Sequence, residues 1–73
     1  MKVNKTQAVL YIFNTLLSQK TINKNDIMSE FDNMDDLKFK RYIQEIRAFL
    51  VNFCLGYELI YDRKDNAYFL QKY

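Results

Sequence analysis

Apolar residues follow helical spacing in three successive stretches of the chain and alternate with polar residues near its end. In residues 5–18 they form one stripe with a leucine on either flank, made of Val9, Ile12, Phe13 and Leu16 between Leu10 and Leu17. The opposite positions carry Gln7, Tyr11, Asn14 and Ser18. Spacings of three and four residues place side chains on one face of an α-helix. The pattern predicts a first helix over residues 5–18.

This pattern breaks before a second, shorter helix. Asn23 is a favourable N-cap residue, and Asp26 lies three positions later, where a carboxylate stabilises the positive end of the helix dipole. Ile22 and Ile27 occupy the two positions of a hydrophobic staple around this cap. The helix is expected to end near Phe31.

The longest apolar repeat follows a polar turn at residues 32–33. Asp35 is the expected N-cap, and the apolar stripe after it consists of Phe39, Ile43, Ile46, Leu50 and Phe53. The only glycine, Gly56, lies just past this stripe, where it can adopt a positive φ and release the chain from the helix. The pattern predicts a third helix over residues 36–53.

After Gly56 the hydrophobic period changes from 3.6 to two. Residues 57–62 and 67–71 alternate in this way around a charged turn, residues 62–66, which predicts a β-hairpin. The expected fold is α+β: a single winged helix-turn-helix domain over residues 1–73, with three helices followed by a two-stranded β-hairpin wing. A three-helix bundle with a peripheral hairpin is the alternative.

The composition narrows the setting in which this domain works. The 73 residues carry a net charge of +2, which permits contact with nucleic acid without requiring it. A lone cysteine, Cys54, cannot form an internal disulfide and suits a reducing compartment. No signal peptide and no apolar run of membrane-spanning length is visible, so we expect a cytoplasmic protein without membrane contact. The Met1 start favours a whole protein over a domain cut from a longer regulator.

Catalysis has no support in the sequence. Histidine is absent, which removes the usual general base near neutral pH. Cys54 lies among apolar residues and is expected to be an inert core thiol. With one glycine there is no phosphate-binding loop, and no spacing of carboxylates suggests a metal site. We expect no enzyme activity, no cofactor, no metal and no small-molecule substrate.

Several segments match the motifs of a known family of regulators. They are residues 12–17 (IFNTLL), 22–27 (INKNDI), 40–47 (KRYIQEIR), 56–64 (GYELIYDRK) and 67–70 (AYFL). Over these segments the chain resembles the DNA-binding domain of DeoR-type regulators, especially those that carry a WYL domain, whose signature reads KRDIxxLR. The resemblance implies sequence-specific binding of double-stranded DNA. The third helix would lie in the major groove, and the wing would contact the backbone or minor groove.

The outward side of the third helix and the hairpin turn hold the candidate DNA contacts. Lys38, Lys40 and Arg41 can meet phosphates or base edges, and Gln44 suits adenine. The turn adds two further cations, Arg63 and Lys64. A basic but merely solvated helix face explains the spacing equally well, and Asp62 and Asp65 nearly cancel the charge of the turn.

The chain departs from the family where the third helix opens. The family has Ser, Arg and Thr at positions that correspond here to Asp35, Leu37 and Lys38, and Tyr42 replaces the Asp of its signature. Carboxylates at this end of a recognition helix are repelled by phosphates. Asp35 and its neighbour Asp36 have a second explanation, since a cap and a first-turn acid both stabilise a helix.

Three apolar side chains on outward positions suggest a protein partner as well. Leu37 can contact a thymine methyl group or anchor a protein contact, and Val51 lies further along the same side. Tyr11 on the first helix suits a dimer interface, although half-buried tyrosines are common without one.

Two hypotheses follow. The first is a small DNA-binding transcriptional regulator acting as a homodimer, because one such module makes few contacts. The alternative is a phage or mobile-element module of the anti-CRISPR or anti-repressor type, which binds a host protein through the same scaffold.

Overall fold

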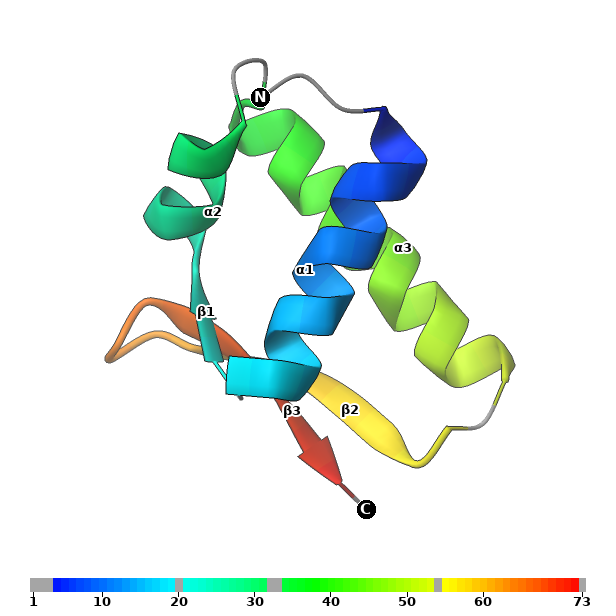
Figure 1. The fold of residues 1–73 in the computed structure, drawn as a ribbon. Coiled ribbons are helices and arrows are strands. Elements are labelled where there is room, and N and C mark those ends of the chain that lie inside the picture. The colour runs from blue at the N-terminus through cyan, green and yellow to red at the C-terminus, as the bar shows by residue number, and fades with distance from the viewer. Residues whose placement is uncertain (1–3, 20, 32–33, 54, 73) are drawn as a thin grey trace.

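Helices and strands follow one another in the order α1, β1, α2, α3, β2, β3 (Figure 1). The computed structural model describes residues 4–19, 21–31, 34–53 and 55–72. The helices are α1 (Lys5–Gln19), α2 (Lys24–Glu30) and α3 (Asp36–Asn52), and the strands are β1 (Thr21–Asn23), β2 (Tyr57–Asp62) and β3 (Ala67–Lys72). The three predicted helices and the two predicted strands are confirmed, with ends displaced by at most one residue.

Both predicted helix starts form as expected. The side chain of Asn23 accepts a hydrogen bond from the backbone N–H of Asn25, and that of Asp35 accepts one from the N–H of Lys38, both at 2.8 Å. Each bond satisfies a donor that the first turn of a helix leaves without a partner. Gly56 adopts a φ of +79°, the left-handed conformation predicted for it.

The sheet has three antiparallel strands, in the order β1-β3-β2, and this corrects the prediction of a two-stranded hairpin. In the register, Ile22 of β1 lies opposite Tyr68 of β3, and Leu59 of β2 lies opposite Leu70. Three residues are too few to show an alternation in the sequence, and the partner of β1 lies more than forty residues further along. The resulting α+β layout is compatible with a winged helix.

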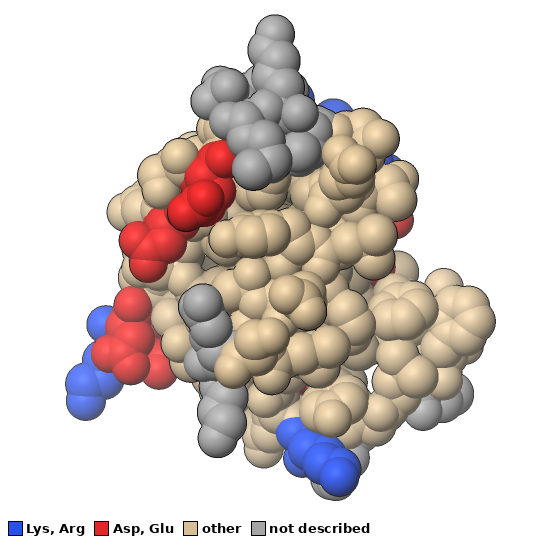
Figure 2. Space-filling view, in the orientation of Figure 1, with Lys and Arg blue, Asp and Glu red and all other residues tan. Residues whose placement is uncertain are grey.

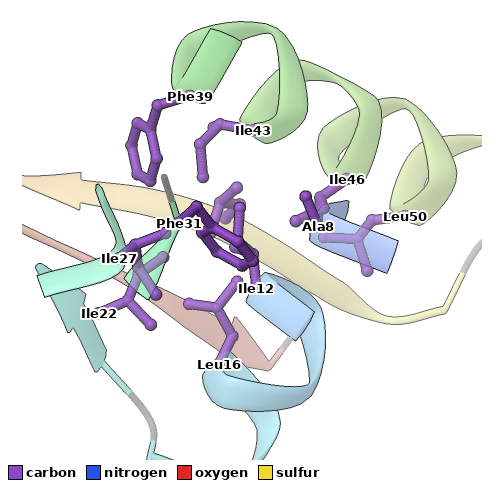
Figure 3. Packing of buried hydrophobic residues seen from close by; sticks show 11 residues of the cluster. Ala8, Ile12, Leu16, Ile22, Ile27, Phe31, Phe39, Ile43, Ile46 and Leu50 are labelled. Carbon is purple, nitrogen blue, oxygen red and sulfur yellow. The ribbon is translucent and has the colours of Figure 1, made fainter. Parts of the chain in front are cut away.

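The core lies between the three helices and the inner face of the sheet (Figure 3). Its buried apolar residues come from all three helices, from β1 and β2, and from the residue that follows α2: Ala8, Ile12, Leu16, Ile22, Ile27, Phe31, Phe39, Ile43, Ile46, Leu50 and Leu59. Tyr57, Tyr68 and Leu70 pack against them from the sheet. The hairpin therefore closes the core, which argues against a bundle with a merely peripheral hairpin.

Parts of two predicted apolar stripes are less buried than the sequence pattern predicts. In α1 the buried side is rotated towards Ala8 and Thr15, so that Val9 and Phe13 are only partly buried. Thr15 tolerates burial because its hydroxyl donates to the carbonyl of Tyr11 at 2.8 Å. Phe53, predicted as the last core position of α3, is instead 66% exposed, because the helix ends at Asn52 and the chain turns away there.

Two predictions cannot be compared with the structure. The polar turn at residues 32–33 and the core thiol of Cys54 lie outside the described residues. Within the described ranges, no helix is long and apolar enough to cross a membrane.

Candidate nucleic-acid interface

Helix α3 is held on three sides, a buried side and two flanks, and is open on the fourth. Its buried side carries Phe39, Ile43, Ile46 and Leu50. On one flank the ammonium of Lys5 in α1 pairs with Glu45 at 3.1 Å, and on the other Arg47 donates to the carbonyl of Leu59 in β2 at 3.4 Å. These contacts on both flanks fix the rotation of α3 about its own axis, and therefore the direction that its open side faces.

The predicted contacts of α3 fall on this open side, with one exception. Lys40, Arg41 and Gln44 are exposed, and Leu37 beside them is 58% exposed. Among the residues that the structure describes, neither Lys40 nor Arg41 forms an ion pair. Lys38 differs, because it is half-buried and already has an interaction of its own. The open side thus offers two unpaired cations and one amide.

The two carboxylates at the start of α3 are both engaged within the chain. Asp35 caps the helix, and Asp36 forms an ion pair with Lys24 of α2 at 3.0 Å. The hydrogen bond and the charge of Asp36 raise the pKa of Lys24 above its ordinary value. The negative charge that a phosphate would meet at this end is therefore partly compensated. Lys24 was not among the predicted site residues, because a pair that joins two helices has no signature in the sequence.

The hairpin turn presents its two cations on a constrained tip. Arg63 and Lys64 are exposed, and the backbone N–H of Lys64 donates to Asp62 at 2.9 Å. Asn66, with a φ of +51°, accepts a hydrogen bond on its side-chain oxygen from the Tyr61 hydroxyl at 2.6 Å. Its carbonyl accepts a second one from the side chain of Asn23 at 3.1 Å. Hydrogen bonds thus join the turn to Tyr61 of β2 and to Asn23 of β1.

A line of aromatic rings connects this tip to α3. The ring of Phe39 lies 5.5 Å from that of Tyr68, which lies 4.9 Å from that of Tyr61. Tyr61 then bonds to Asn66 in the turn, so each step from the buried side of α3 to the wing tip is a direct contact. Edge and tilted ring pairs add to the energy of burial and fix relative orientation. The helix and the wing are therefore positioned as one surface, which the alternation of strand residues alone did not indicate.

Comparison with protein-family models, with curated proteins and with solved structures finds no match for this chain.

The remaining predicted interface residues are separated in space. Val51 is exposed near the end of α3, about two turns beyond Gln44, the last candidate DNA contact on this helix. Tyr11 lies on α1, where its ring makes an edge contact with Phe31 at 5.4 Å and lines an open hollow with Asp26 and Glu30. Figure 2 shows acidic side chains along that side of the molecule, over α2. Tyr11 therefore does not belong to the surface formed by the open side of α3 and the hairpin turn.

The described residues contain no group of three or more His, Cys, Asp or Glu side chains that could hold a metal ion. Three hollows on the surface of the described residues are partly open to solvent. The open side of α3 offers the positive charges of Lys40 and Arg41, one amide and one exposed leucine, and the turn adds two cations beside the carboxylates of Asp62 and Asp65.

Proposed function

We propose that the protein is a small DNA-binding transcriptional regulator of the cytoplasm, built as a winged helix-turn-helix and acting without catalysis. Helix α3 would enter the major groove with Arg41 and Gln44 towards base edges. Lys38 and Lys40 would lie near phosphates, and the wing tip would add Arg63 and Lys64. The observation that carries the proposal is the exposure of Lys40, Arg41 and Gln44 on one side of a helix whose other sides are anchored.

The geometry of the wing supports the same proposal. Contacts to the phosphate backbone fix the register and orientation of a protein on the duplex. The ring series from Phe39 to Tyr61 couples the tip to α3, so phosphate contacts at the tip would orient the helix. A single module of this size makes few contacts, and we propose that two copies bind two half-sites.

The test is the affinity for a labelled duplex of random sequence, measured by fluorescence anisotropy over a series of salt concentrations. Four cations at phosphates, Lys38, Lys40, Arg63 and Lys64, predict that log K falls with log salt with a slope of about −3 to −4. Replacing Arg63 and Lys64 together by Gln should reduce the slope by about two. Lys72→Gln is the matched control, because Lys72 is exposed on the same sheet at the end opposite the tip. Absence of binding, or binding without salt dependence, contradicts the proposal.

A second function is favoured by Leu37, an apolar side chain at the centre of the open side of α3. Exposed leucines at such a place can anchor a protein contact. The corresponding proposal is a phage or mobile-element module that binds a host protein, as anti-CRISPR and anti-repressor proteins do. Capture of a partner from host lysate that survives nuclease treatment and is lost in Leu37→Glu supports this function. Loss of all partners with nuclease contradicts it.

A further inference from the structure

Helix α1 carries an exposed surface that the proposed DNA contacts do not use. Leu10 and Leu17 on this helix are 61% and 50% exposed, and Phe13 between them is partly buried. The three positions are spaced by three and four residues, so they lie on one side of α1. Phe49 and Phe53 at the end of α3 are 40% and 66% exposed.

These residues form one continuous surface. The ring of Phe13 lies 5.6 Å from that of Phe49, which lies 5.3 Å from that of Phe53. The edge contact between the first pair joins α1 to α3 directly. We call Leu10, Phe13, Leu17, Phe49 and Phe53 the α1 patch.

The α1 patch lacks charge to an unusual degree. Helix α1 contains a single charged residue, Lys5, in its fifteen positions, and Lys5 is paired with Glu45. Figure 2 shows a broad uncharged area over α1 and towards the end of α3. Depletion of charged residues together with enrichment in aromatic ones distinguishes the core of a protein interface from the rest of a surface.

We infer that the α1 patch is the surface through which two copies of this chain associate. An uncharged apolar surface is complementary to itself, so a second copy meets it without repulsion between like charges, as a two-fold interface requires. A partner of different sequence would be selected by charges around the contact, and α1 provides only one.

The area is sufficient for the centre of such an interface. The exposed parts of Leu10, Leu17, Phe49 and Phe53 equal about two fully exposed large side chains, or on the order of 400 Å². That is about half of the roughly 800 Å² that each partner contributes to an interface of standard size.

Association through this patch leaves the DNA surface open. At about 100° and 1.5 Å per residue, Phe49 lies about 80° around α3 from Arg41 and about 12 Å further along the helix axis, and Phe53 follows the end of the helix. The inference deepens the proposed function, because it names the contact that would bring two reading helices to two half-sites. Its test requires no DNA, so the two can fail separately.

The test is sedimentation of the full chain across a series of concentrations. The wild type should move from 8.9 kDa towards twice that mass as concentration rises. Leu10→Glu and Phe53→Glu should each raise the dissociation constant more than tenfold, and Leu37→Glu, an equally exposed control on the open side of α3, should not. Circular dichroism checks that each variant is folded.

Two results would overturn the inference. One is a chain that sediments as a monomer at all concentrations, which would overturn the inference even if that chain binds duplex DNA. The other is a dimer that Leu37→Glu dissociates and that Leu10→Glu and Phe53→Glu leave intact.

Discussion

Helices α1 and α3 bury similar apolar stripes and differ in what they expose. Helix α1 has one charged residue in fifteen, whereas α3 has six in seventeen, all between Asp36 and Arg47. The last turn of α3 has none, and its Phe49 joins the uncharged side of α1 through Phe13. Burial accounts for the fold of both helices equally, so the exposed sides carry the information about function. One side suits an apolar partner, and the other suits phosphates.

The largest expected effect comes from a change that destabilises the whole fold, and with it the exposed sides of both α1 and α3. Phe39 is fully buried in α3 and starts the ring series to the wing, so Phe39→Ala should lower the free energy of unfolding by about 3–5 kcal/mol. Denaturant unfolding followed by circular dichroism measures it. The control is Leu37→Ala, which truncates an exposed side chain of the same helix outside the α1 patch and should change the value by about 0.5 kcal/mol or less. Equal effects of the two variants would contradict the core described here.

Arg41→Ala should separate the two exposed sides. If Arg41 reaches a base edge, its loss weakens binding to a selected duplex by about 1–3 kcal/mol while sedimentation of the protein is unchanged. Leu10→Ala should behave in the opposite way, with self-association weakened and DNA affinity per subunit retained. Parallel losses in both variants would mean that the two surfaces are one.

Asp35 gives a test that separates helix stability from DNA binding. Asp35→Ala removes the cap on Lys38 and should cost about 1 kcal/mol of unfolding free energy. Asp35→Asn keeps a capping side chain, so stability should be nearly unchanged, while the loss of a negative charge should strengthen DNA binding. Calorimetry and anisotropy on the same samples measure the two effects. A weaker affinity in Asp35→Asn would show that DNA does not approach this end of α3.

A smaller effect is expected from Tyr61→Phe. The variant keeps the ring contact with Tyr68 and loses only the hydrogen bond to Asn66, which should cost about 1 kcal/mol or less because the site is exposed. The consequence should be a looser wing tip, seen as faster amide exchange at residues 62–66. Unchanged exchange there would contradict the role of this bond in holding the tip.

The smallest effect concerns the pair between Lys24 and Asp36. Because the pair raises the pKa of Lys24 above 10.5 in the folded state, its contribution to stability is fully present below pH 10.5 and is lost as pH rises through the raised pKa. The difference in unfolding free energy between wild type and Asp36→Asn should therefore shrink above pH 10.5. A difference that is constant from pH 7 to pH 12 would argue against the pair.

The local parts of this fold were predictable from the sequence, and the parts that depend on distant partners were not. The caps at Asn23 and Asp35 and the positive φ of Gly56 act within a few residues, so the residue types at these positions are enough to predict them. Strand β1 has three residues and exists because β3 pairs with it. Phe53 matched the period of α3, but the helix ends one residue before it, so periodicity alone misplaced it in the core.

The same division applies to the candidate site. The exposure of Lys40, Arg41 and Gln44 follows from helical geometry, and the structure places them as expected. The pairing of Lys24 with Asp36 depends on how α2 meets α3, which no local pattern encodes. The half-burial of Lys38 likewise has no signature in the sequence.

The central claim, that α3 and the wing tip form the DNA surface and α1 does not, is tested most directly by NMR. Duplex DNA carrying a single half-site, which cannot bring two copies together, would be titrated into the ¹⁵N-labelled chain at a fixed protein concentration, and amide shifts would be followed. The account predicts shifts that concentrate in residues 37–48 and 62–66 and leave the amides of Leu10, Asn14 and Leu17 unmoved. Shifts confined to α1, with α3 and the turn silent, would contradict it.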